Sequence, residues 1–306
     1  MDTLIIGMPA YNESRHIAEA LDSILNQSYK DFKLIVLDDN SNDETVKILS
    51  SYAKLDSRIL VIRNHENMGN LYCFLELLKM SKSTYFGWLG AHDILGKDYL
   101  QVLVETLEKN TYINYAFGSL IFIDEESNFT GRAKSELSMR RSPDQPWKNY
   151  INSIGESRKG GLNFHGVYRL KILDNFAVQQ TKTLVGWDHI IVSRALFFGA
   201  EFVSTAQYKM RVFKNRKSTT YTRIVPKNSP LQSIKPTYIP LLKGFLVDWW
   251  SLPVGLLTRV IFLPTVIWKI RVSYDFKLVR NLVNFHRFRI TNIFQGKNRQ
   301  KSITKI

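Results

Sequence analysis

The sequence predicts an α/β fold with a mostly parallel sheet, on three observations. Short apolar runs alternate with segments whose apolar residues recur at helical spacing, as in βαβ units. The runs are apolar at every position, which is typical of strands that are buried on both faces. Two acids, Asp38 and Asp39, directly follow the run at residues 34–37. Ligands bind to parallel sheets at this carboxyl edge of the strands.

The expected elements alternate regularly along the first part of the chain. Strands are predicted at Thr3–Met8, Leu34–Leu37, Ile59–Ile62, Tyr85–Leu89 and Tyr115–Phe117. Helices are predicted between them, over 17–25, 46–52, 71–78 and 98–109, because apolar residues there recur every three or four positions. Ser41 and Glu44 have the spacing of a capping box, which predicts a helix start at that point.

Charge divides the chain into two unequal parts. Residues 1–208 hold 22 Lys/Arg against 25 Asp/Glu, and residues 209–306 hold 20 against two, so the net charges are −3 and +18. The basic part predicts an anionic partner, either a membrane surface or a nucleic acid. The single cysteine, Cys73, fits a reducing compartment, and the first residues lack the pattern of a signal peptide. We therefore expect a cytoplasmic protein.

The strand ends indicate a nucleotide site without a glycine-rich loop. Neither a G-x-G-x-x-G nor a G-x-x-x-x-G-K-[ST] motif occurs, which argues against a dinucleotide-binding domain and a P-loop. Acids and amides stand at the strand ends instead. A negatively charged nucleotide beside these acids needs a cation between them, so a divalent metal, Mn²⁺ or Mg²⁺, is expected.

Several motifs, in this order and at this spacing, resemble the inverting glycosyltransferases of family 2, which have the GT-A fold. The resemblance covers residues 1 to about 212 and is carried by Pro9-Ala10-Tyr11-Asn12-Glu13, Asp38-Asp39-x-Ser41-x-Asp43, Asn67-x-Gly69 and Gly90-Ala91-His92-Asp93. It implies a nucleotide-binding half at 1–118 and an acceptor half at 119–212.

The resemblance implies that Asp39 accepts a hydrogen bond from the donor's base, which is uracil in most relatives. An ionised carboxylate is a suitable partner for a ring N–H. Pro9 and Tyr11 would flank the base, with half-buried packing as the alternative for Tyr11. Asn12 and Glu13 would orient the first loop. Arg211 would lie near the donor phosphates, with a solvated charge as the alternative. Asn67 and Gly69 are also assigned to the donor side.

The metal motif departs from the family pattern. Acids are common at the positions of Gly90 and His92, and only Asp93 is acidic here. Imidazole suits Mn²⁺ better than Mg²⁺, which prefers oxygen. Either His92 and Asp93 share a Mn²⁺-like metal, or Asp93 holds an ion and His92 has a polar role.

The resemblance implies that Asp188, in Gly186-Trp187-Asp188 ahead of a helical pattern, is the catalytic base. A base there would remove the proton of the acceptor hydroxyl as its oxygen attacks the anomeric carbon. The alternative is a simple helix N-cap, and one residue can fill both roles.

The C-terminal part changes composition after a predicted linker at 213–235. Residues 236–306 are expected to associate with a membrane. Residues 249–268 are long enough to span a bilayer, but Arg259 and two prolines favour a position in the interface. The pattern of residues 276–294 predicts a basic amphipathic helix. The alternative is an ordinary helical cap on the enzyme.

Together these features predict an enzyme that transfers a sugar from a UDP-sugar to a glycan acceptor. The basic tail and the family resemblance indicate a lipid-linked acceptor, surface polysaccharide synthesis, and a peripheral position at the inner face of the cell membrane. Two alternatives stay open. One is a degenerate GT-A protein that binds glycan or a partner without turnover. The other is a nucleic-acid-binding protein, which the lack of any recognisable module disfavours.

Overall fold

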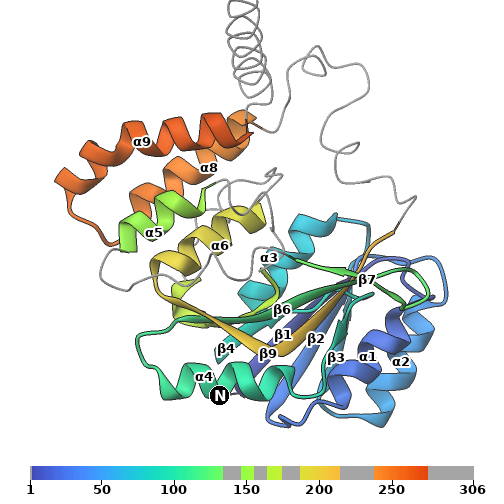
Figure 1. The fold of residues 1–306 in the computed structure, drawn as a ribbon. Helices are drawn as coiled ribbons and strands as arrows, with labels where there is room; N and C mark the ends of the chain where they lie inside the picture. Colours follow the sequence, from blue (N-terminus) through green and yellow to red (C-terminus); the bar gives the residue numbers. More distant parts are fainter. Residues whose placement is uncertain (1, 134–145, 155–163, 174–186, 214–237, 275–306) are drawn as a thin grey trace, which may run out of the picture.

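The chain folds into an α/β body that carries a helical layer on one face of its sheet (Figure 1). The structure is a computed structural model and describes residues 2–133, 146–154, 164–173, 187–213 and 238–274. The first half consists of β1 (Asp2–Ala10), α1 (Ile17–Leu25), β2 (Phe32–Asp38), α2 (Thr45–Leu55), β3 (Ile59–Arg63), α3 (Asn70–Met80), β4 (Ser83–Trp88), β5 (Ile94–Leu95) and α4 (Tyr99–Lys109).

The second half adds strands to the same sheet and helices to one of its faces. Its elements are β6 (Tyr115–Ile123), β7 (Phe129–Arg132), α5 (Pro146–Ser153), β8 (Val167–Arg169), the short helix η4 (Leu170–Ile172), α6 (Trp187–Phe197), β9 (Ala200–Arg211), α8 (Tyr238–Ser251) and α9 (Leu256–Tyr274). In Figure 1, α8 and α9 lie beyond α5 and α6, far from α1 and α2.

The described strands form one nine-stranded sheet in the order β3-β2-β1-β4-β8-β6-β9-β5, with β7 beside β6. Strands β1, β2, β3 and β4 are parallel, and β6 and β9 are parallel to each other. Strand β8 is antiparallel to both of its neighbours, β4 and β6. The predicted α/β fold with a mostly parallel sheet is confirmed.

Alternate residues of the central strands face two separate cores, as the two-residue period of a strand requires. In β1, Leu4 and Ile6 pack with α1 and α4, whereas Ile5 packs with α3 and α6 on the other face. All three side chains are at most 4% exposed. Burial on both faces explains why the strand runs are apolar at every position.

The predicted capping box does not form. Helix α2 begins at Thr45, and its N-cap residue, Glu44, makes no side-chain capping bond. The Ser41 hydroxyl instead donates to Asp38 Oδ1 and accepts a hydrogen bond from the backbone N–H of Asn12. Ser41 therefore joins the two loops at the edge of the sheet, a tertiary contact that outweighs its local capping preference.

Helices α8 and α9 pack onto the acceptor half, as in the alternative of a helical cap. Phe245 and Trp249 of α8, and Val266 and Ile270 of α9, are fully buried in the same core as α5 and α6. Asp248 pairs with Arg194 of α6 at 2.9 Å, and both side chains are at most 6% exposed. The predicted amphipathic helix at 276–294 lies outside the described residues. Membrane association of 236–306 stays a prediction.

The buried pair between Asp248 and Arg194 predicts a large effect of one substitution. Asp248→Ala leaves the Arg194 guanidinium buried without its counter-charge, so the free energy of unfolding should fall by roughly 3–5 kcal/mol. Urea denaturation measures the change. The control is Glu44→Ala, which removes an exposed ion pair with Lys47 at 3.0 Å and should change stability by about 0–1 kcal/mol. Equal effects of the two substitutions would contradict a stabilising role for the buried pair.

Candidate active site

The carboxylate of Asp39 holds the loop that follows β3. It lies at the end of β2, is 4% exposed, and accepts three hydrogen bonds. The donors are Asn64 Nδ2 at 2.8 Å and the backbone N–H groups of Met68 at 2.7 Å and Gly69 at 2.8 Å. Gly69 has φ +91°, a conformation that favours glycine. Asp39 and Gly69, which were predicted to share a site, are therefore in direct contact.

The first loop, residues 11–14, is hydrogen-bonded to residues 42–45, around the start of α2. Asn42 N–H donates to the Asn12 side-chain oxygen at 3.0 Å, and Glu13 N–H donates to the Thr45 hydroxyl at 2.8 Å. Asn12 has φ +54°, a left-handed conformation that asparagine tolerates better than most residues. These contacts match the predicted role of Asn12 and Glu13 in orienting this loop.

Tyr11 and Pro9 lie at the same edge of the sheet as Asp39. The Asp39 N–H donates to the carbonyl of Ala10 at 2.8 Å, between Pro9 and Tyr11 in the chain. Tyr11 is 39% exposed and Pro9 is partly exposed. The aromatic ring of Tyr11 is therefore accessible beside a buried carboxylate, an arrangement that a planar, hydrogen-bonding ring could use.

Asp93 connects the end of β4 to β9. Its carboxylate is buried and accepts the Tyr208 hydroxyl and the backbone N–H of Arg211, both at 2.8 Å. Burial and the Asp93 charge raise the pKa of Tyr208 well above its ordinary value, so its hydroxyl is a proton donor at any physiological pH. Gly90 lies beneath this carboxylate, and a Cβ there would clash with it.

The structure gives Arg211 a different position from the expected one near donor phosphates. Its five guanidinium N–H groups are all used inside the protein. Nε donates to the His92 carbonyl, Nη1 to the carbonyls of Asp124 and Glu125, and Nη2 to Glu19 and Ser127. Arg211 is 3% exposed. It joins the loop at His92, the turn at 124–127 and helix α1, and it has no N–H left for a phosphate. It is not a solvated charge either.

His92 points to the first loop. Its Nδ1 lies 3.1 Å from Glu13 Oε1, and its Nε2 lies 3.9 Å from Asp93 Oδ1. Among the described residues no three His, Cys, Asp or Glu side chains are grouped as metal ligands. The Asp93 side chain is 2% exposed and is bonded to β9 through both oxygens, and the positively charged guanidinium of Arg211 donates to the carbonyl of His92. In this arrangement the side chains of His92 and Asp93 do not fit a divalent metal.

Asp188 lies in the first turn of α6, at an end of the helix that packs against β4. The ring of Trp187 is 6.0 Å from that of Trp88, the last residue of β4, and 5.0 Å from that of Phe164. Burial lowers the pKa of His165, and the charges of Asp93 and Asp188 both act in the opposite direction. Trp187, next to Asp188 in the chain, thus packs against the end of β4, the strand that leads into residues 90–93.

Sequence reasoning missed two residues of this region. Tyr208 stacks on His165, with ring centroids 4.4 Å apart, and bonds Asp93. Asn64 bonds Asp39 from the strand end next to it. Tyr208 stands three residues before Arg211, which the resemblance did identify, whereas nothing local distinguishes Asn64. Asn67 lies in the loop that Asp39 holds, between Asn64 and Met68.

Comparison with known proteins gives one family. Residues 5–177 match the family model described as Glycosyl transferase family 2. An uncharacterized glycosyltransferase of Haemophilus influenzae is 36% identical over 124 residues, which cover 40% of this chain and 38% of the relative. The putative teichuronic acid biosynthesis glycosyltransferase TuaG of Bacillus subtilis is 32% identical over 117 residues, 38% of this chain and 46% of the relative. This chain thus spans less than half the length of either relative.

A solved structure supports the fold. Residues 1–349 of S. aureus TarS, in complex with UDP-GlcNAc, match with a TM-score of 0.62 and 16% sequence identity. The match covers 89% of this chain and 73% of that chain. At this identity the likeness shows the fold alone, and it agrees with the predicted GT-A architecture.

The packing around Asp93 predicts that position 90 accepts only glycine. In Gly90→Ala the new Cβ displaces the Asp93 carboxylate from Tyr208 and from β9, so the protein should lose about 1–3 kcal/mol of stability. Gly255→Ala is the matched control, since a Cβ there meets nothing within 4 Å. Urea denaturation of both variants compares them. A tolerated alanine at position 90 would mean that Asp93 is not held as described.

Proposed function

Because this chain belongs to glycosyl transferase family 2, we propose that it transfers a sugar from a nucleotide-diphosphate sugar, UDP-linked by preference, to a glycan acceptor with inversion. The observation that carries the proposal is the shared position of Tyr11 and Asp39 at the carboxyl edge of the sheet. The UDP-GlcNAc bound to TarS, a protein of the same fold, supports a UDP-sugar donor.

Asp39 retains the capacity to bind a base. The loop at residues 64–69 takes three of the about four acceptor positions of this carboxylate, and the thiol of Cys73 is a further, weak donor to it. The ring N–H of uracil would take the place of the thiol while Tyr11 stacks on the base. Pro9 and the loop that contains Asn67 and Gly69 would border the same nucleotide. Asp39 then links the base contact to the conformation of the loop.

Asp188 is the proposed general base. It takes the proton of the acceptor hydroxyl as that oxygen forms a bond to the anomeric carbon. The bond from this carbon to the diphosphate oxygen breaks in the same step, and its electron pair leaves with the nucleoside diphosphate. A displacement from the opposite side inverts the anomeric configuration. The place of Asp188 in the first turn of α6, beside Trp187, which packs against Trp88 at the end of β4, supports this assignment.

We derive no step through a divalent metal. The family resemblance implies one, but the side chains of His92 and Asp93 do not fit it as arranged. Asp93 and Arg211 act instead as positioning residues: they fix the main chain at 90–93 relative to β9. The first loop is fixed in turn through the contact of His92 with Glu13.

The acceptor is proposed to be a lipid-linked glycan of a surface polysaccharide, at an anionic membrane on the cytoplasmic side. TuaG, a similar protein, is named for teichuronic acid biosynthesis. The net charge of +18 in residues 209–306 supports an anionic surface. The basic charge alone does not support nucleic acid, because no recognition module accompanies it.

Asp39→Ala should weaken UDP binding by about ten- to a hundredfold, since a hydrogen bond to a charged group contributes roughly 1.5–3 kcal/mol. Isothermal titration with UDP measures the affinity. Asn64→Ala is the matched control, because it removes one bond between Asp39 and the loop without touching the base site. If Asn64→Ala weakens binding as much as Asp39→Ala, then Asp39 acts only through the loop.

Asp188→Asn keeps the shape of the side chain and removes the base. Turnover, measured as UDP release from a UDP-sugar that the unmodified enzyme uses, should fall by about 10²–10⁴-fold. UDP affinity should stay within about twofold. Glu105→Gln, at a partly exposed acid of α4, is the control for loss of a carboxylate. Turnover near the original rate in Asp188→Asn would place the base elsewhere.

A further inference from the structure

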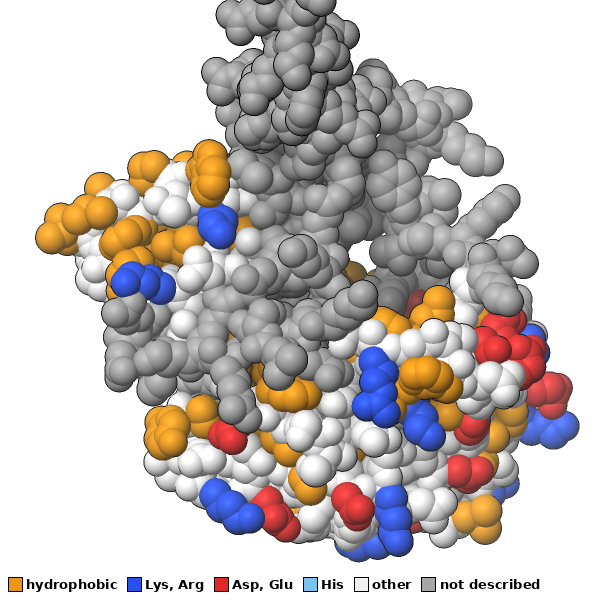
Figure 2. Space-filling view, in the orientation of Figure 1, with side chains coloured by type: hydrophobic (Ala, Val, Ile, Leu, Met, Phe, Trp, Pro, Cys, Tyr) orange, Lys and Arg blue, Asp and Glu red, His pale blue; other side chains and the backbone are white. Residues whose placement is uncertain are grey.

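Helix α9 is apolar on the side that packs and also on the side that does not. Val266 and Ile270 face the core and are fully buried. The opposite side exposes a second set of large apolar side chains, which we call the outer face: Leu256, Leu257, Val260, Ile261 and Trp268, each more than half exposed. Figure 2 shows apolar side chains gathered over this helix.

The outer face is a continuous stripe. Leu256 and Leu257 are followed after three or four residues by Val260 and Ile261, and Trp268 comes two turns after Ile261, so all five lie on one side of the helix, with the exposed Pro264 between them. At 1.5 Å per residue the stripe is about 18 Å long. Scattered exposed leucines need no explanation, but a contiguous apolar surface of this kind marks an interaction site.

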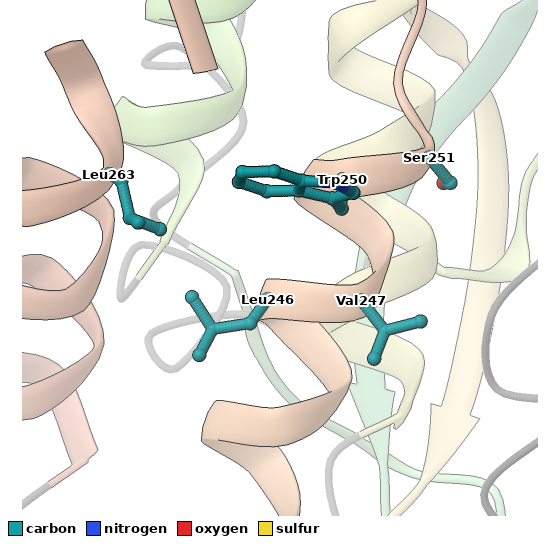
Figure 3. A pocket seen from close by; sticks show the side chains of 5 residues that line it. All are labelled: Leu246, Val247, Trp250, Ser251 and Leu263. Carbon is teal, nitrogen blue, oxygen red and sulfur yellow. The ribbon is translucent and has the colours of Figure 1, made fainter. Parts of the chain in front are cut away.

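A cavity adjoins this surface. It has a volume of about 550 Å³ and lies between α8 and α9, lined by Leu246, Val247, Trp250, Ser251 and Leu263. Figure 3 shows Leu246 and Trp250 of α8 directed toward Leu263 of α9. Trp250 is 47% exposed. The walls are almost entirely apolar, so the cavity suits a hydrocarbon chain better than a polar ligand.

The charges around this surface have one sign. Within 238–274 the one acid is Asp248, and its buried pairing with Arg194 removes it from the surface. Lys243, Arg259, Lys269 and Arg271 are the basic residues of the same range, and residues 209–306 carry a net charge of +18. A second copy of the chain would bring the same positive charge against it. An anionic bilayer supplies both the opposite charge and the apolar environment.

We propose that the outer face of α9, with Trp250 and the adjoining cavity, docks into the interface of an anionic bilayer; this partner rests on the proposed lipid-linked acceptor. Among the described residues no helix is long and apolar enough to cross a membrane. The proposed position is the interface, because the other side of α9 is buried in the protein through Val266 and Ile270. Within residues 249–268, Trp249 is fully buried and Phe262 packs against the core, so neither belongs to the outer face.

Helix α9 is connected to α6, the helix that carries the proposed base, through direct contacts between helices. α9 packs on α8, and α8 is joined to α6 by the Arg194–Asp248 pair. Asp188 is in the first turn of that same α6. The bilayer contact and the proposed base thus belong to one packed group of helices, which would set the distance of the base from a membrane-bound acceptor.

The test compares two double variants of the full chain. Leu257→Glu/Ile261→Glu places two charges on the outer face. Leu55→Glu/Leu60→Glu makes the same change far from α9 in the chain, at two leucines of α2 and β3 that are 86% and 52% exposed. Binding to vesicles of phosphatidylglycerol and phosphatidylcholine is measured by sedimentation at about 0.1 M and about 1 M salt, because the Debye length falls from about 10 Å to about 3 Å.

The unmodified chain and the Leu55/Leu60 variant should bind anionic vesicles and keep a part of this binding at high salt. The Leu257/Ile261 variant should bind at least tenfold more weakly and lose the salt-resistant part. Equal binding of both variants, or complete loss of binding by the unmodified chain at high salt, would overturn the proposal. The proposal would also be overturned if the unmodified chain is a dimer, the Leu257/Ile261 variant is a monomer, and neither of them binds vesicles.

UDP titration separates this proposal from the proposed function. Both double variants should bind UDP as the unmodified chain does, because their substitutions lie outside the candidate site. If the chain binds vesicles through α9 but does not bind UDP, the proposed docking surface is supported and the proposed UDP-sugar donor is wrong.

Discussion

The buried carboxylate of Asp93 is the contact on which the rest of the site depends. It joins the end of β4 to β9, from which Tyr208 and Arg211 each donate at 2.8 Å. Through Arg211 the same contact reaches the turn at 124–127 and α1. Through His92 it reaches Glu13 in the first loop. The loops at the carboxyl edge are therefore placed by one charge that is buried with its donors, as buried charges must be.

This arrangement gives a physical reason for the departure from the family's metal motif. Position 90 lies under the Asp93 carboxylate, where even a Cβ does not fit, so an acid there is incompatible with the observed packing. His92 is directed to Glu13, and its carbonyl accepts from Arg211. The residues that would bind an ion in the family pattern are used here to hold loops in place.

The C-terminal helices combine two properties that seemed to be alternatives. They form a cap, because α8 buries Trp249 and pairs Asp248 with Arg194. Burial raises the pKa of Asp248 to about 6, and the charge of Arg194 opposes this rise. They also keep an apolar surface on α9 that the described residues do not cover. A cap with one packed side and one exposed apolar side suits a protein that works between water and lipid.

The sequence by itself determined the α/β fold, the family, and the meeting of Tyr11 and Asp39 at one edge. These follow from local patterns: apolar runs such as Leu34–Leu37, and motifs at fixed places after strands. Only the tertiary structure decided the contacts of Arg211, the use of Ser41, and the burial of Trp249. Many of their partners are distant in the chain: Asn12 lies 29 residues from Ser41, and Glu19 lies 192 residues from Arg211. Local spacing cannot specify such partners, because they depend on which strands and helices pack together.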